Sequence, residues 1–168
     1  MDSLAEANRL RSEAYENGSE NSRVARFVAM LRSPAMALSL EDIEGYLQQL
    51  ERRFEKLEDG TLLVSMGAQR PPVAMRVAPP VAVLQVGITD APAGEAPRHV
   101  ALYRRMLELN ATELVHAAYG IEKDRVVLAA ALDLDNLGFT ELEAVLADMD
   151  MALANHVPEL HGLLQGKA

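Results

Sequence analysis

The chain has 168 residues, no cysteine and a formal net charge of −9 at pH 7, which is long enough for one domain with its own hydrophobic core. The missing cysteine excludes a disulfide framework, a thiolate zinc site and a catalytic thiol. Seven acids and no lysine or arginine lie between Val126 and Gly166, so the last third lacks the basic surface that nucleic-acid binding requires.

Residues 1–38 are predicted to form a helical N-terminal extension. The first ten residues carry two acids and no apolar run, which argues against a secretory signal. After the turn sequence NGSENS, apolar residues follow the i, i+3, i+4, i+7 spacing of an amphipathic helix. These residues are Val24, Phe27, Val28 and Leu31. Ser33-Pro34 should end this helix, because the residue before a proline is disfavoured in the α conformation.

Residues 39–168 are predicted to form the main domain, beginning with a helix at Ser39. Ser39 and Asp42 have the spacing of a capping box, which stabilises a helix start by about 1 kcal/mol. We predict one helix that continues to the Asp59-Gly60 break, with charged residues 51–56 facing solvent. Its apolar stripe consists of Ile43, Tyr46, Leu47, Leu50, Phe54 and Leu57.

Three strands are predicted next, over residues 61–67, 73–78 and 81–87. Pro79-Pro80 should lie in the connection between the last two, because proline cannot donate to a central ladder. The longest apolar stretch, Val77–Val86, is too short to span a membrane and contains both prolines. We therefore expect a soluble protein without membrane insertion.

The second and third of these strands are apolar on both faces apart from Arg76 and Gln85. One face should pack on helices. The other face must be covered in one of four ways: by other parts of the same domain, by the N-terminal extension, by a second copy, or by a client peptide. We predict that these strands carry a partner-binding surface. Its residues are Val73, Met75, Val77, Val81, Val83, Leu84 and Val86.

A loop over residues 89–97 should lead to a helix over residues 98–109, with Asn110 just after its end. Strands are then predicted over residues 113–119 and 125–133, joined by a polar hairpin. The apolar face of the helix raises the same question of what covers it. If the protein forms a dimer, we predict the interface on this face, together with a histidine on the first strand. Its residues are Val100, Tyr103, Met106, Leu107 and His116.

The last helix is predicted to start at Thr140, which forms a capping box with Glu143. The segment around His156 and Pro158 should add a short turn or helix. The apolar stripe of the main helix consists of Leu142, Val145, Leu146, Met149 and Leu153.

The run Asp133-Leu-Asp-Asn-Leu-Gly138 half resembles a calcium loop, but it fails on ligand count. If Asp133 is position 1, position 5 is Leu137, and position 12, where a bidentate glutamate is required, is Ala144. We interpret the run as a linker pinned to the core by its leucines. We therefore predict no metal site here.

The four histidines also fail to form a metal or catalytic pattern. His156 and His161 are five residues apart, which places them on different faces of a helix. His99 stands alone, and His116 is interpreted as an edge or interface residue. The sequence contains no glycine-rich phosphate loop and no Gly-x-Ser-x-Gly elbow. We expect no enzyme activity, no catalytic residues and no cofactor.

The predicted order of elements is α-β-β-β-α-β-β-α after the N-terminal helical extension. Strands that arrive as hairpins rather than as βαβ units favour an antiparallel sheet flanked by helices, the α+β class. The most distinctive stretch is LYRRMLELNATELVHAAYGIEKDRVVLAAALDLDNLGFTELEAVLADMD. It contains a helix ending in Leu-x-x-Asn, a strand ending in aromatic-Gly, a polar hairpin, a VVL strand, an L-x-L-D-x-L exit and an acidic helix start.

Over residues 39–157 this order and these motifs resemble the type III secretion chaperone fold, the CesT/Tir-chaperone group that also contains the YbjN-like proteins. The resemblance implies a small, acidic, cytoplasmic, non-enzymatic bacterial protein that forms a homodimer. It also implies that the protein holds a client segment on apolar sheet and helix surfaces, partly by adding client strands. The alternative is a YbjN-like regulatory or structural protein whose groove is sealed by residues 1–38.

Overall fold

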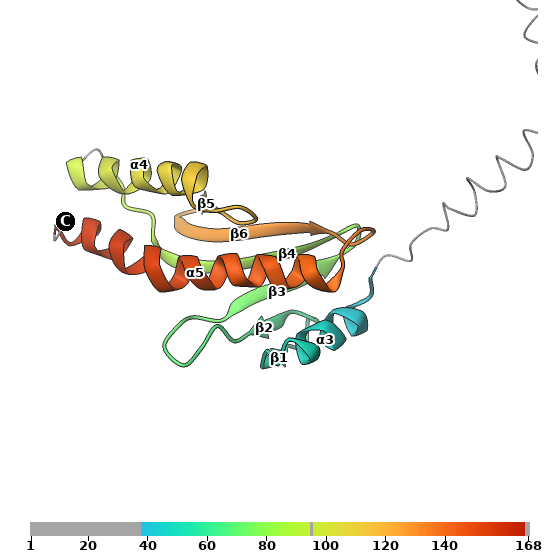
Figure 1. Cartoon of the computed structure of the whole chain (residues 1–168). Coiled ribbons are helices and arrows are strands. Elements are labelled where there is room, and N and C mark those ends of the chain that lie inside the picture. The colour runs from blue at the N-terminus through green and yellow to red at the C-terminus, as the bar shows by residue number, and fades with distance from the viewer. Residues whose placement is uncertain (1–37, 95, 167–168) are drawn as a thin grey trace, which may run out of the picture. The chain divides into compact units, whose positions relative to one another are not determined.

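The structure is a computed structural model that describes residues 38–94 and 96–166. In these residues three helices accompany one six-stranded antiparallel sheet (Figure 1). The predicted α+β class is confirmed, and the order of elements differs by one additional strand near the start. The predicted N-terminal extension lies outside the described residues except for Leu38, so it stays a prediction, as does the domain boundary at residue 39.

The sheet has the strand order β1-β2-β3-β4-β6-β5, so β1 and β5 form its two edges. The elements in chain order are α3 (Leu40–Gln49), β1 (Phe54–Lys56), β2 (Leu62–Val64), β3 (Val73–Ala78), β4 (Val81–Asp90), α4 (Pro97–Thr112), β5 (Ala118–Glu122), β6 (Arg125–Asp133) and α5 (Phe139–Leu164). Pro79 and Pro80 lie in the turn between β3 and β4, as predicted. None of the described helices combines the length and apolar character needed to cross a membrane.

Helix α3 begins as predicted but ends earlier. The Ser39 N–H donates to Asp42 Oδ2 at 2.9 Å, and the Asp42 N–H donates to Ser39 Oγ at 3.2 Å. The hydrogen bonds that the Ser39 N–H and hydroxyl donate to the Asp42 carboxylate lower its pKa. At the other end Glu51 has a φ of 54°, and the Arg52 N–H donates to Leu47 O at 2.9 Å. This left-handed cap ends the helix.

The prediction of one helix to Asp59 was therefore wrong, because residues 54–56 form β1 and pair with β2. Charged residues in 51–56 are not a helix face either. Arg52 contacts Asp150 on α5 at 2.9 Å, and Lys56 contacts Glu44 at 2.8 Å. A short amphipathic run fits a strand as well as a helix, and here the hairpin with β2 decides the outcome.

The hydrophobic core lies between the three helices and one face of the sheet. The strand register aligns Leu62 with Met75, Met75 with Leu84 and Leu84 with Ala130, and all four side chains are buried. Helix α5 runs across this face, with α4 beside β5 and α3 beside β1 (Figure 1). The core side chains that the helices contribute include Ile43, Leu47, Leu102, Leu109, Leu142 and Leu146.

Helix α5 is one continuous helix of 26 residues. It begins at Phe139, and the Gly138 N–H donates to Glu141 Oε2 at 3.1 Å, so the predicted capping box of Thr140 and Glu143 was wrong. The predicted apolar stripe is buried as expected. The segment around Pro158 continues the same helix instead of forming a separate turn.

Candidate protein-binding surfaces

The six-stranded sheet has one face that no described helix covers. On this face the register places Ala74 beside Gln85, and Gln85 beside Ala129, in one row. The next row contains Arg76, Val83 and Ala131. We call this surface the open sheet face. Its apolar and small residues are Leu63, Ala74, Val81, Val83, Val127, Ala129 and Ala131, all exposed or half-buried.

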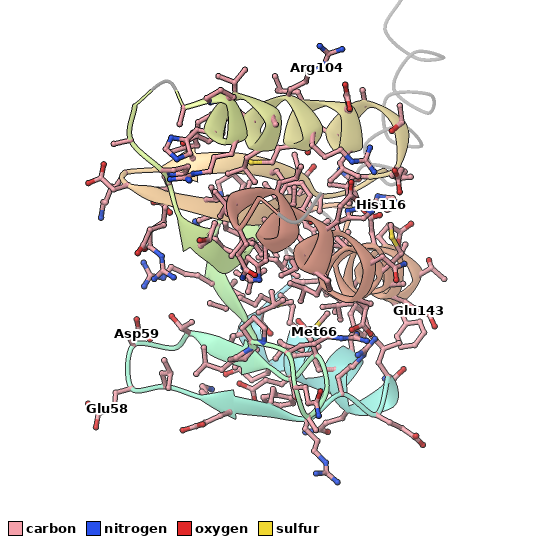
Figure 2. The ribbon with its side chains drawn as sticks, turned by 90° about the vertical axis from the view of Figure 1, so that its left-hand side faces the viewer. Glu58, Asp59, Met66, Arg104, His116 and Glu143 are labelled. Atoms are coloured by element: carbon pink, nitrogen blue, oxygen red, sulfur yellow. The ribbon has the colours of Figure 1, made fainter. Side chains whose placement is uncertain are left out.

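Charged and polar side chains also lie within the open sheet face, with Gln85 between Ala74 and Ala129 and with Arg76 beside Val83. Arg76 contacts Asp59 at 3.1 Å, and Gln85 donates to the carboxylate of Glu122. Figure 2 shows Asp59 on the side of the molecule away from His116 and Glu143. The open sheet face is therefore a mixture of apolar and polar side chains, which is the usual composition of a surface that binds another protein non-obligately.

The structure separates the predicted partner-binding residues into two groups. Val73, Met75, Leu84 and Val86 are at most 3% exposed and belong to the core, so in this fold they offer no surface to a partner. Val77 is half-buried on the helix-covered face, since it pairs with buried Ala82. Only Val81 and Val83 of the predicted set lie on the open sheet face. The other apolar and small residues of this face were not predicted: Leu63, Ala74, Val127, Ala129 and Ala131.

The second candidate surface lies where α4 runs beside edge strand β5. Val100, Leu107 and Ile121 are 56%, 69% and 54% exposed. A groove of about 290 Å³ separates the two elements. It is lined by Tyr103, Met106, Leu107, Tyr119, Gly120 and Ile121. We call these residues together with Val100 the α4–β5 surface.

Four of the five predicted dimer residues belong to the α4–β5 surface. Val100 and Leu107 protrude, whereas Met106 is 4% exposed and forms the floor of the groove. The Tyr103 hydroxyl donates to Pro92 O at 2.9 Å, which holds its ring in place. His116 is exposed, but it lies in the turn before β5 and not on a strand. Their role in a dimer stays a prediction.

The strand predicted over residues 113–119 is present as β5 but begins only at Ala118, because α4 continues to Thr112 and Asp148 of α5 holds the segment between them. Asp148 Oδ2 accepts the N–H groups of Val115, His116 and Ala117 at 3.2, 2.8 and 2.9 Å. Three backbone donors that converge on one carboxylate cannot also form a ladder. Asp150, two residues on, instead accepts from Arg52 and Arg70.

A network of charged side chains fixes the end of α4 against α5. Arg105 contacts Glu159 at 2.6 Å and Glu113 at 3.2 Å, and its hydrogen bond to Glu159 lowers the pKa of that carboxyl. His156 Nε2 lies 3.2 Å from Glu113 Oε2. Burial raises the pKa of the neighbouring Tyr119 phenol well above its usual value. The α4–β5 surface is therefore preformed, because both of its elements are held by α5.

Replacing Asp148 by alanine should lower the free energy of unfolding by about 2–3 kcal/mol, since hydrogen bonds to a charged group contribute more than neutral ones. Urea denaturation measures this change. Asp135→Ala removes the same charge from an exposed position and should change stability by less than about 0.5 kcal/mol. Equal losses for the two variants would show that charge, and not the backbone contacts of Asp148, is responsible.

The residues that resembled a calcium loop form a local turn. Asp133 Oδ1 accepts the Asp135 N–H at 3.1 Å, and Oδ2 accepts from Asn136 Nδ2 at 2.8 Å. Leu134 and Leu137 are buried. Among the described residues, no group of three or more His, Cys, Asp or Glu side chains is placed to hold a metal ion.

Comparison with known proteins gives a family and several structural neighbours, two of which are described below. The CesT_Tir_1 family model matches residues 36–165. The complex of ExoU and SpcU from the type III secretion system of Pseudomonas aeruginosa contains a chain with 19% identity and a TM-score of 0.56; the match covers 69% of this chain and 95% of that one.

The second neighbour is YbjN, described as a putative transcription regulator from E. coli, with 12% identity and a TM-score of 0.51; here the match covers 72% of this chain and 95% of that one. At these identities the two neighbours show a shared fold. No curated protein sequence matches the chain.

Proposed function

Because the chain belongs to the CesT_Tir_1 family, whose model matches residues 36–165, we propose that it is a non-enzymatic, chaperone-like protein that works as a cytoplasmic homodimer. In this proposal it holds a segment of another protein. The observation that carries the proposal is the pair of exposed apolar surfaces, the α4–β5 surface and the open sheet face, on opposite sides of one rigid framework. In this proposal the α4–β5 surface binds the second copy, and the open sheet face binds the client.

The α4–β5 surface is suited to a second copy because its pattern is self-complementary. In a two-fold interface the same patch occurs on both subunits. If two α4 helices pack antiparallel, Val100 of one subunit faces Leu107 of the partner subunit. Glu108, which contacts Arg104 at 3.0 Å, then faces the positively charged start of the other helix near Arg98. Apolar and charged contacts are thereby satisfied together.

The homodimer is tested by size-exclusion chromatography with light scattering. One chain has a mass of 18.3 kDa, and the protein at micromolar concentration should elute with twice that mass. A strict monomer over this range would contradict the dimer, and a larger assembly would contradict a closed two-fold interface.

The open sheet face is suited to a client segment because the described helices leave it free. An extended segment can place alternate side chains over Leu63, Val83 and Val127. The neighbouring structure of ExoU and SpcU is a heterodimeric complex of two different proteins, which supports protein binding as the use of this fold. Ala131, beside Val83 on β6, allows close approach of another chain on that side, whereas Arg76 lies on the other side.

Client binding is tested by capture from the native host with the tagged full chain. Val83→Asp places a charge at the centre of the open sheet face and should abolish capture of the client. Val115→Asp places the same charge on an 80% exposed residue away from this face and should leave capture intact. Equal capture by both variants would remove the open sheet face as the binding site.

The alternative proposal is a YbjN-like regulatory or structural protein in which residues 1–38 seal the groove that a client would otherwise occupy. Charge favours it: residues 21–36 contain three arginines and no acid, whereas residues 38–168 contain 20 acids and 11 lysines and arginines. Deleting residues 1–37 should then increase the fluorescence of a dye that binds apolar surface. If dye binding and mass both stay unchanged, the sealed form is wrong.

A further inference from the structure

Strand β5 has a free edge, and free edges are sites where another strand can add. Its residues pair with β6 on one side only. Antiparallel pairing alternates, so every second residue directs its N–H and C=O toward the partner strand and the others direct them away. The two-residue turn Lys123-Asp124 makes Glu122 and Arg125 a hydrogen-bonded pair. Tyr119 and Ile121 therefore direct their backbone groups to the free edge.

The side chain of Asn110, on the last turn of α4, occupies this edge at Tyr119. The Tyr119 N–H donates to Asn110 Oδ1 at 2.7 Å, and Asn110 Nδ2 donates to Tyr119 O at 3.0 Å. A carboxamide carries one acceptor and one donor group side by side, as a peptide group does. Asn110 thus satisfies both backbone groups that an added strand would need at this position.

We propose that Asn110 closes the β5 edge to strand addition, so that the α4–β5 surface accepts the folded second copy through side chains and does not accept an extended peptide. That a second copy binds the α4–β5 surface rests on the proposed function, whereas the closure of the β5 edge by Asn110 does not. Helix α4 itself supports the closure, because the groove beside Ile121 is walled by Tyr103 and Leu107. An incoming strand would have to displace these side chains.

Amide hydrogen exchange of the full chain tests the closure directly. In the wild type the Tyr119 amide should exchange at least tenfold more slowly than the Ile121 amide, since only the first has a hydrogen-bond acceptor in Asn110. Asn110→Ala should abolish this difference. Equal exchange of the two amides in the folded wild type would overturn the proposal, and this measurement needs no variant to fold.

The mass of the assemblies in solution tests the consequence of opening the β5 edge. Asn110→Ala should form assemblies larger than the wild-type species, because two open edges can pair. Thr112→Ala, which removes a hydroxyl bonded to Glu108 O on the same turn of α4, should not. If Asn110→Ala stays folded with the wild-type mass, the closure is not what limits association and the proposal is wrong. A wild-type monomer that associates on Asn110→Ala would support the closure while contradicting the proposed homodimer.

Discussion

Replacing Leu107 by aspartate is expected to convert the proposed homodimer into a monomer. Leu107 is 69% exposed on α4 and in the proposed interface packs against Val100 of the partner subunit. Burial of an unpaired carboxylate in an apolar contact removes the gain from the leucine and adds a desolvation cost. A central interface residue of this kind is worth about 2–4 kcal/mol, which corresponds to a dissociation constant raised about 30- to 1000-fold.

The change should leave the fold of each subunit intact, because the Leu107 side chain contributes little to the core. Stability of the isolated subunit should stay within about 0.5 kcal/mol of the wild type. Sedimentation equilibrium over a concentration series measures the dissociation constant, with Val115→Asp as the matched control. Val115 is 80% exposed in the turn before β5, and its variant should remain dimeric. Dissociation of both variants would point to added negative charge instead of loss of the α4 contact.

The parts of the fold that were predicted correctly depend on contacts close in sequence. The capping pair Ser39 and Asp42 is local, and so is the apolar stripe of α5. The helix start at Phe139 was missed because two pairs have the three-residue spacing of a capping box, Gly138 with Glu141 and Thr140 with Glu143. In the structure the Gly138 N–H donates to Glu141, so the first pair forms the cap.

The parts that were missed depend on contacts distant in sequence. Phe54 fits a helix stripe and a strand equally, and its pairing with Val64 decides the outcome. The strand expected at His116 is replaced by a turn because of Asp148, 32 residues further along the chain. Side chains that bond a remote backbone leave no periodic pattern, so the contacts of Asp148 could not be recognised from the sequence. Asn110 was predicted only as the residue after the helix end, and its bonds to Tyr119 were missed.

The two proposed surfaces do not compete for the same side chains. The α4–β5 surface is formed on the helix-covered side of an edge strand, whereas the open sheet face is the opposite face of the central strands. A homodimer built through α4 therefore leaves both open sheet faces available. This geometry allows one dimer to hold two client segments, or two parts of one segment.

Neighbouring residues of β4 should respond in opposite ways to substitution, because they face opposite sides of the sheet. Leu84 is fully buried and pairs with Met75 and Ala130, so Leu84→Ala should lower the free energy of unfolding by about 3 kcal/mol, within the range for large-to-small core changes. Val83 is 37% exposed on the open sheet face, and Val83→Ala should cost less than about 1 kcal/mol.

Urea denaturation of the two variants measures the difference, and client capture separates stability from binding. Leu84→Ala should still capture the client under conditions where it is folded, because its side chain never reaches the surface. Val83→Asp should fold and fail to capture. The reverse result, a large stability loss at Val83 with binding lost at Leu84, would mean that the open sheet face is covered in the working protein. The client would then have to bind elsewhere.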